Sequence, residues 1–166
     1  MLLEEDTLAS SVGDALVARG ARVAVAETTA GGLISARLLS VAGASAWFDR
    51  GSVCYGGRSK QETTGIDTEI LRTHGAVSVE AVSAMAEGIR ATAGVAFGVA
   101  ESGIAGPAGS RRSPKPVGTV VIAVAGPAGT TCEEHTFVGT RVQFMAQIAE
   151  HALRMLAQAV ATADGS

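Results

Sequence analysis

The sequence has few of the features that mark several common classes of protein. Cysteines number two in 166 residues, and Cys54 and Cys132 show no C-x-x-C spacing, which excludes a disulfide scaffold and a zinc knuckle and fits a reducing compartment. Charged residues are scarce at 17%, and the formal net charge of −3 argues against a protein that binds nucleic acid by neutralising its phosphates.

Long apolar runs are also missing. The longest are strand-sized, well short of the ~20 residues that a transmembrane helix needs. The first residues, MLLEED, are acidic where a secretory signal would be basic. We therefore expect a cytoplasmic protein that has neither a nucleic acid nor a membrane as partner.

Aromatic residues make up only 4% of the chain, whereas glycine is abundant, with 21 residues. The hydrophobic fraction of 47% excludes a disordered chain, and the length fits one domain with its own core. So much glycine in an apolar domain favours tight turns and loops whose backbone approaches a ligand closely.

The order of hydrophobic patterns predicts a single α/β domain over residues 1–166, with frayed ends at 1–6 and 161–166. The last two strands are expected to form an antiparallel hairpin around Gly126 and Pro127, which gives a mixed sheet between helix layers. Helices are expected at 8–19, 33–39, 78–92 and 141–160, with a short one near Lys60. Strands are expected at 22–26, 51–55, 95–100, 118–125 and 131–137. The pattern over 41–48 leaves the secondary structure of that segment ambiguous.

Three segments that follow predicted strands are candidates for the chemistry, because ligands of open α/β sheets bind at the carboxyl ends of strands. The first is Glu27-Thr28-Thr29-Ala30-Gly31-Gly32, where a strand runs into a helix. Free backbone N–H groups at such a helix start attract an anion or an oxyanion. The alternative is an ordinary helix cap with glycines for packing.

The second segment is Tyr55-Gly56-Gly57-Arg58-Ser59-Lys60. A lysine near a hydroxyl is a candidate base of a Ser/Thr–Lys dyad if burial lowers its pKa, and Tyr55 is a candidate orienting group. The alternative is a solvent-facing lysine beside a core tyrosine.

The third segment runs from Glu101 to Gly109 and opens a long Gly/Pro/Ser-rich loop over 102–116. Its glycines let backbone amides approach a bound group, but it lacks the Lys-Ser/Thr of a Walker loop, which argues against a nucleoside triphosphate. Arg111, Arg112 and Lys115 make its far end basic, for a phosphate or simply for solvation. His74, His135 and His151 show no metal-ligand spacing, and we expect each to be structural or exposed, with no metal site.

The chain resembles the C-terminal domain of the CinA family, the nicotinamide-nucleotide amidase domain, over nearly its whole length. Five strings carry the resemblance in register: A-E-x-x-x-G-G at 26–32, A-G-A-S-A-W-F-D-R-G at 42–51, H-G-A-V-S at 74–78, S-G-I-A-G-P at 102–107 and K-P-V-G-T-V at 115–120. The family's amino-terminal domain is absent from this sequence, so the chain looks like a stand-alone unit.

The resemblance implies a three-layer α/β/α sandwich with a mixed, mostly parallel sheet, which often forms oligomers, with a dimer as the family-level expectation. It also implies a cofactor-free hydrolase that converts nicotinamide mononucleotide to its nicotinate form and releases ammonia. The family's motifs E-S-C-T-G-G and Y-S-N-E-A-K put the nucleophile at Thr28, the aromatic residue at Tyr55 and the base at Lys60. Its G-D-R corresponds to 139–141, so Arg141 is the candidate for a substrate phosphate.

The departures from the family pattern lie in the site. Thr28, Thr29 and Ala30 stand where the family has Ser, Cys and Thr, and Gly56-Gly57-Arg58-Ser59 replaces S-N-E-A. Glu101 replaces a small or apolar residue, and Met145 stands where a second arginine is common. The lost arginine is worth ~1.5–3 kcal/mol, a tenfold to hundredfold loss of affinity for a phosphorylated substrate.

Because Glu101 adds a further negative charge, we expect a related amide substrate that lacks the phosphate. Glu101 is expected either to pair with Lys60 and hold it protonated, or to activate water itself. A non-catalytic relative that binds a ligand or a partner is the alternative function. The candidate catalytic residues are Thr28, Thr29, Tyr55, Lys60 and Glu101, and the candidate substrate-binding residues are Glu27, Ala30, Gly31, Gly32, Ser102, Gly103, Ile104, Ala105, Gly106 and Arg141.

Overall fold

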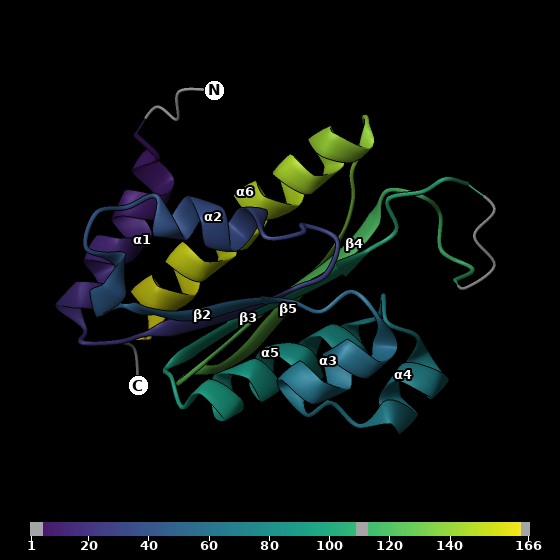
Figure 1. The fold of residues 1–166 in the computed structure, drawn as a ribbon, viewed down its shortest axis with the longest axis horizontal. Helices are drawn as coiled ribbons and strands as arrows, with labels where there is room; N and C mark the ends of the chain where they lie inside the picture. Colours follow the sequence, from purple (N-terminus) through teal and green to yellow (C-terminus); the bar gives the residue numbers. More distant parts are fainter. Residues whose placement is uncertain (1–4, 109–112, 164–166) are drawn as a thin grey trace.

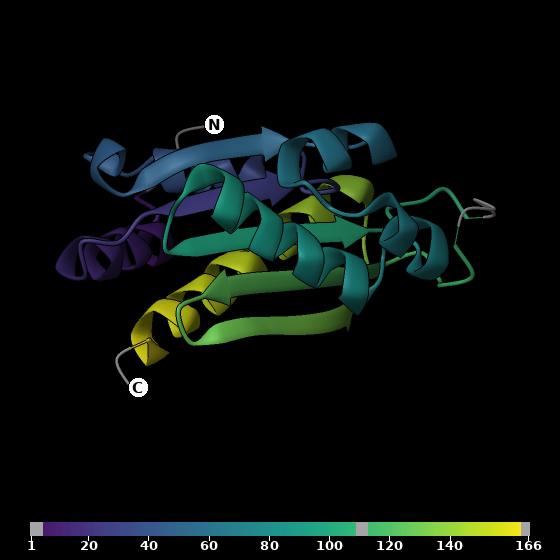
Figure 2. The same ribbon diagram turned by 90° about the horizontal axis from the view of Figure 1, so that it is seen from below.

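A computed structural model describes residues 5–108 and 113–163 of the chain. One five-stranded sheet lies between two layers of helices (Figures 1 and 2). Helices α1, α2 and α6 cover one face of the sheet, and α3, α4 and α5 cover the other. This arrangement is the three-layer α/β/α sandwich that the sequence predicts.

The predicted elements follow one another in the expected order, with one additional helix between them. The helices are α1 (Thr7–Ala18), α2 (Leu33–Leu39), α3 (Gly57–Thr64), α4 (Thr68–His74), α5 (Val79–Ala93) and α6 (Arg141–Thr162), with a 3₁₀ turn at Ala44–Ala46 inside the ambiguous segment. The strands are β1 (Val23–Glu27), β2 (Phe48–Val53), β3 (Phe97–Gly103), β4 (Thr119–Gly126) and β5 (Gly129–Thr136).

The strand order is β2-β1-β3-β4-β5. Both neighbours of β1 run parallel to it, whereas β4 is antiparallel to β3 and to β5. Four of the five strands therefore point the same way, and the predicted β4–β5 hairpin is confirmed. The chain leaves β1 toward β2 on one side and returns to β3 on the other, so a crevice opens beyond the carboxyl end of β1.

The alternation of side chains along β1 and β3 divides the core in two. Val25 and Val99 belong to the cluster under α1, α2 and α6, and Ala26 and Ala100 to the cluster under α5. The alanines keep the second layer close to the sheet, which brings α3 near the strand ends because α3 packs against α5.

Helix α4 is the element that the sequence analysis missed. It has seven residues, and none of them is buried, so no apolar stripe marks it. Asp67 caps it by accepting a hydrogen bond from the amide of Glu69 at 2.9 Å. Strand β3 also extends to Gly103, so the expected start of the loop at Ser102 was wrong by two residues.

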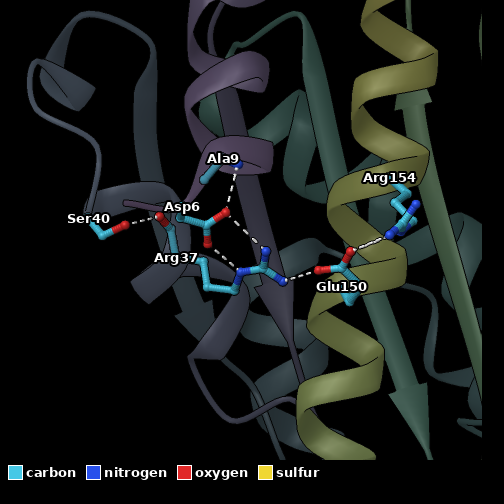
Figure 3. Close-up of polar contacts among 6 residues, drawn as sticks. All are labelled: Asp6, Ala9, Arg37, Ser40, Glu150 and Arg154. Atoms are coloured by element: carbon cyan, nitrogen blue, oxygen red, sulfur yellow. Dashed lines mark hydrogen bonds and ion pairs between the residues drawn. The ribbon is translucent and has the colours of Figure 1, made fainter. Parts of the chain in front are cut away.

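Two described features lie within the expected frayed ends, because α6 continues to Thr162 and Asp6 caps α1. The Asp6 carboxylate also accepts a hydrogen bond at 2.6 Å from Arg37 of α2, whose guanidinium reaches Glu150 of α6 at 2.8 Å. Figure 3 shows this chain of ion pairs, which continues to Arg154. The other residues of the expected frayed ends, 1–4 and 164–166, lie outside the described residues.

None of the described helices is both long and apolar enough to cross a membrane.

Candidate active site

A cavity of about 510 Å³ lies beyond the carboxyl ends of β1 and β3, in the crevice that the strand order creates. It brings together residues from segments that are far apart in the sequence. Its described lining is Thr28, Tyr55, Lys60, Arg72, Thr73, His74, Gly75, Ala76, Val77, Ser102, Gly103, Ile104, Ala105, Gly106, Ser113, Pro114 and Lys115.

The turn after β1 folds around the carboxylate of Glu27, which is fully buried. This carboxylate accepts hydrogen bonds from the amides of Gly32, Ile34 and Ser35 at 2.8–3.1 Å and from the Ser35 hydroxyl at 2.5 Å. The start of α2 is therefore already occupied by an internal anion. The expectation that Gly32 offers a free amide to a ligand is wrong, and Glu27 has a structural role here.

A second buried carboxylate, that of Glu101, lies beneath the same turn. Its Oε1 accepts hydrogen bonds from the amides of Thr28 at 2.6 Å and Ala30 at 2.8 Å. Its Oε2 has no hydrogen-bond partner in the described part of the chain. Burial, with the nearby charge of Glu27 adding to it, raises the pKa of Glu101 to about 7, against the lowering effect of the two amides. The alternate residues of β1 and β3 thus direct two acids toward the α2 side of the sheet.

The contacts of Glu101 bear on two sequence-based expectations, and both stay predictions. No ion pair within 4 Å joins it to Lys60, so it does not hold that lysine protonated by direct contact. Glu101 is also absent from the described lining of the cavity, so the hypothesis that it activates water gains no support.

The two candidate threonines differ in their contacts. Thr29 Oγ1 donates to the carbonyl of Gly103 at 3.0 Å and accepts from the amide of Gly103 at 2.9 Å, which ties β1 to β3. Thr28 lines the cavity, and its Oγ1 donates to the carbonyl of Cys54 at 3.4 Å. Neither hydroxyl is hydrogen-bonded to Lys60.

The burial of Lys60 and Tyr55 is the reverse of the alternative of a solvent-facing lysine beside a core tyrosine. Lys60 of α3 is 2% exposed, and its Nζ donates to the carbonyl of Tyr55 at 2.6 Å. Burial lowers the pKa of Lys60, an effect only partly offset by Cys54 and Glu101. The Tyr55 ring is 62% exposed, and its hydroxyl accepts from Arg141 at 3.2 Å. The lysine is therefore in a setting that suits a base, and its role stays a prediction.

The loop after β3 supplies the far wall of the cavity. The amides of Gly103 and Ile104 bond within the protein, to Thr29 Oγ1 and to the carbonyl of Thr119. The amides of Ala105 and Gly106 have no such partner among the described residues, so they are the donors left for a ligand. Arg141 holds this wall by donating to the carbonyl of Gly106 at 2.9 Å.

Outside the cavity wall, a Cβ on Gly31 would lie 3.1 Å from the Met145 methyl group. The residue that replaces the family's arginine therefore covers the turn with an apolar group.

One wall of the cavity comes from residues that the sequence analysis did not select. Arg72, Thr73 and His74 of α4 line it, followed by Gly75–Val77. His74 was expected to be structural or exposed, and the only signal at this position was the string H-G-A-V-S. Lys115 also lines the cavity, whereas Gly109, Arg111 and Arg112 lie outside the described residues. The described residues contain no cluster suited to a metal ion.

Comparisons with known proteins bear on the family and the fold of the chain. The model of the CinA C-terminal domain matches residues 5–160. A CinA-like protein of Anaeromyxobacter dehalogenans (strain 2CP-C) is 46% identical over 152 residues, covering 92% of this chain and 37% of that protein. A CinA-like protein of Syntrophobacter fumaroxidans is 44% identical, covering 92% and 36%. The chain thus spans little more than a third of the curated relatives it matches.

Solved structures give the same result. A CinA superfamily protein from Klebsiella pneumoniae superposes with a TM-score of 0.88 at 32% identity, covering 96% of this chain and 99% of that one. The competence/damage inducible protein CihA from Agrobacterium tumefaciens gives a TM-score of 0.88 at 34% identity, covering 95% and 97%.

Proposed function

The chain belongs to the CinA C-terminal domain family, and from this premise we propose that it is a small-molecule amidohydrolase, which cleaves a C–N amide bond and releases ammonia without a cofactor. In this reaction a hydroxyl at the strand ends attacks the amide carbonyl and Lys60 takes its proton, while Tyr55 orients the substrate. The observation that carries the proposal is Lys60 itself, a buried amine that lines the cavity.

The setting of Lys60 supports a base rather than a structural cation. No carboxylate lies within 4 Å of its Nζ among the described residues, and the more distant charge of Glu101 only partly offsets the cost of burying a positive charge. Burial lowers the pKa of Lys60, which raises the fraction of neutral amine near physiological pH. A neutral amine is the form that accepts a proton from an attacking hydroxyl.

The cavity lining supports a substrate with an anionic group. Lys60, Arg72, His74 and Lys115 line it, and no Asp or Glu does so in the described part of the chain. The expectation of an unphosphorylated substrate rested on the arginine lost at Met145 and on Glu101, and Glu101 is absent from the described lining of the cavity. We therefore put amides bearing a phosphate or a carboxylate first, with nicotinamide mononucleotide as the reference compound and nicotinamide riboside as its uncharged-tail counterpart.

The test is ammonia release from a panel of pyridine and cyclic amides, with and without an anionic group. Lys60→Met keeps the length of the buried stem and removes the amine, and we expect a loss of at least ~10²-fold in kcat, the usual size of a general-base contribution. Arg58→Met is the matched control, because Arg58 lies on the same helix with its side chain 89% exposed. Full activity of the Lys60 variant would refute the proposed base.

The pH profile of the same reaction gives a second measurement. Because burial lowers the pKa of Lys60, we expect kcat/KM to rise with pH and to level off below the ordinary lysine range near ~10. A rate that keeps rising through that range would mean that Lys60 has an ordinary pKa.

A second candidate function is ligand binding without turnover. It is favoured by one observation, that Lys60 Nζ bonds to the Tyr55 carbonyl and to neither threonine hydroxyl. Tight binding of nicotinamide mononucleotide without ammonia release would establish it. Assembly into a homo-oligomer and a cytoplasmic location remain proposals drawn from the family resemblance.

A further inference from the structure

Five hydroxyl-bearing side chains line the described wall of the cavity, and four of them already hydrogen-bond within the protein. The exception is Ser102 of β3, whose hydroxyl has no partner in the described part of the chain although the residue is only 2% exposed. The one fully buried side-chain oxygen without a partner among the described residues is Glu101 Oε2, so the Ser102 hydroxyl is not sealed in the core, and it can reach a molecule bound in the cavity that it lines. The four engaged residues are Thr28, Tyr55, Thr73 and Ser113.

The sheet register places Ser102 beside the turn that the sequence analysis selected. The ladder of β1 and β3 ends with Ala26 paired to Ala100, and its register, extended by two residues, sets Thr28 opposite Ser102. The hydrogen bonds between Thr29 and Gly103 agree with this extension. Thr28 and Ser102 both continue the row of side chains that faces α5, because side chains alternate along a strand. Lys60 enters this side of the sheet from α3, so the cavity joins Ser102, Thr28 and Lys60.

The three hydroxyls at the strand ends are not equally fit to react. Thr29 is held by two hydrogen bonds to the backbone of Gly103. Thr28 carries a secondary alcohol, whose β-branch stiffens χ1 and crowds the attacking oxygen. Ser102 carries a primary alcohol. This hydroxyl can turn toward a substrate without breaking a hydrogen bond to any described residue. It also adjoins the wall where the amides of Ala105 and Gly106 have no hydrogen-bond partner among residues 5–108 and 113–163.

We propose that Ser102, rather than Thr28 or Thr29, is the nucleophile of the amidohydrolase, an inference that rests on the proposed function. Ser102 Oγ attacks the amide carbonyl carbon while its proton passes to the neutral Lys60 amine. The C–N bond then breaks, and the departing nitrogen takes that proton and leaves as ammonia. Water cleaves the resulting Ser102 ester in the same manner, which releases the acid and restores the serine hydroxyl.

The site of covalent modification distinguishes the three hydroxyls. A small alkyl fluorophosphonate reacts with an activated serine and needs no knowledge of the substrate. We expect peptide mapping of the intact protein to place the adduct on Ser102, and Lys60→Met to slow the labelling at least ~10²-fold, whereas the exposed Arg58→Met control labels at the normal rate. An adduct on Thr28, or no adduct at all, would overturn the assignment.

Turnover gives the second arm. Ser102→Ala is expected to lower kcat for ammonia release by at least ~10³-fold with little change in KM, and Thr28→Val, which keeps the side-chain shape, to lower it far less. The reverse ranking would return the nucleophile to Thr28 and leave the amidohydrolase proposal intact. Absence of ammonia from every amide with wild-type protein would instead defeat the proposed function, while the labelling pattern would still decide whether Lys60 activates Ser102.

Discussion

Single residues decide which groups in this site are free to react. At the ends of β1 and β3, the acids Glu27 and Glu101 lie on one face and the hydroxyls Thr28 and Ser102 on the other. The acids hold the backbone amides of the turn, so these donors are withdrawn from a substrate. Glu101 lies 73 residues from Thr28 in the sequence, and a pairing over that distance depends on the fold. The sequence could therefore locate the turn, but it could not show that the backbone amides of the turn are already hydrogen-bonded to buried carboxylates.

The pH dependence of stability tests the buried Glu101. Its pKa is raised to about 7 in the folded protein, so its contribution is fully present below the unfolded value of 4.5 and is lost as pH rises through about 7. The shift corresponds to about 3 kcal/mol, and Glu101→Gln removes the titration while its Oε1 still accepts from the two amides. Urea unfolding should show the wild type losing stability relative to this variant between pH 5 and pH 8.5. Parallel curves for the two proteins would mean that Glu101 titrates normally.

Between the elements, a chain of ion pairs centred on Arg37 joins the three helices of the α1/α2/α6 layer. The guanidinium joins the N-cap residue of α1 to the middle of α6, as Figure 3 shows. Its side chain is 26% exposed, so these pairs are less screened than most surface pairs. Arg37 thus helps to fix the position of α2, whose first turn holds the buried Glu27 carboxylate.

Removal of the Arg37 guanidinium measures how much these ion pairs contribute to the free energy of unfolding. Arg37→Met should lower the free energy of unfolding by about 1–3 kcal/mol, the range for hydrogen bonds to charged groups. Because Arg37 lowers the pKa of Asp6, the effect is present at neutral pH and is lost as pH falls through that lowered pKa. Arg154→Met, at a side chain 67% exposed, should change stability by about 0.5 kcal/mol or less. Equal effects of the two substitutions would contradict the role of Arg37.

Elements with a strong local signal could be predicted, and those without one could not. Helix α2 was predicted at its observed bounds, and Ser78, where the next long helix was expected to begin, caps α5 by accepting from the Ala81 amide at 3.1 Å. Helix α4 has no buried residue, so only its place in the fold reveals that it walls the cavity. Lys60 illustrates the same limit, since a polar stretch around it gave no sign of burial.

At the scale of the whole molecule, the site depends on the spacing between α3, α5 and the sheet. Lys60 reaches the strand ends because α3 packs on α5 and α5 packs on the sheet. Small residues allow both approaches: a Cβ on Gly98 would lie 2.2 Å from the carbonyl oxygen of Ala86, and one on Gly88 would lie 2.0 Å from that of Thr64. Thr64 ends α3, and its hydroxyl donates to the carbonyl of Lys60 at 2.7 Å. A contact on the outer layer is thereby linked to the position of the proposed base.

Gly88→Ala tests this link between packing and chemistry. The added methyl group meets backbone rather than a flexible side chain, so α3 has to move away from α5, at a cost of about 1–3 kcal/mol in unfolding free energy. A displacement of Lys60 by about 1 Å is enough to lower kcat by ~10²-fold in protein that is still folded. Gly57→Ala is the control, because nothing lies within 4 Å of its Cβ and it begins the same helix. Ammonia release and urea unfolding, both measured well below the melting temperature, separate the loss of activity from the loss of stability. A Gly88 variant that loses stability but keeps full activity would show that the position of Lys60 does not depend on this contact.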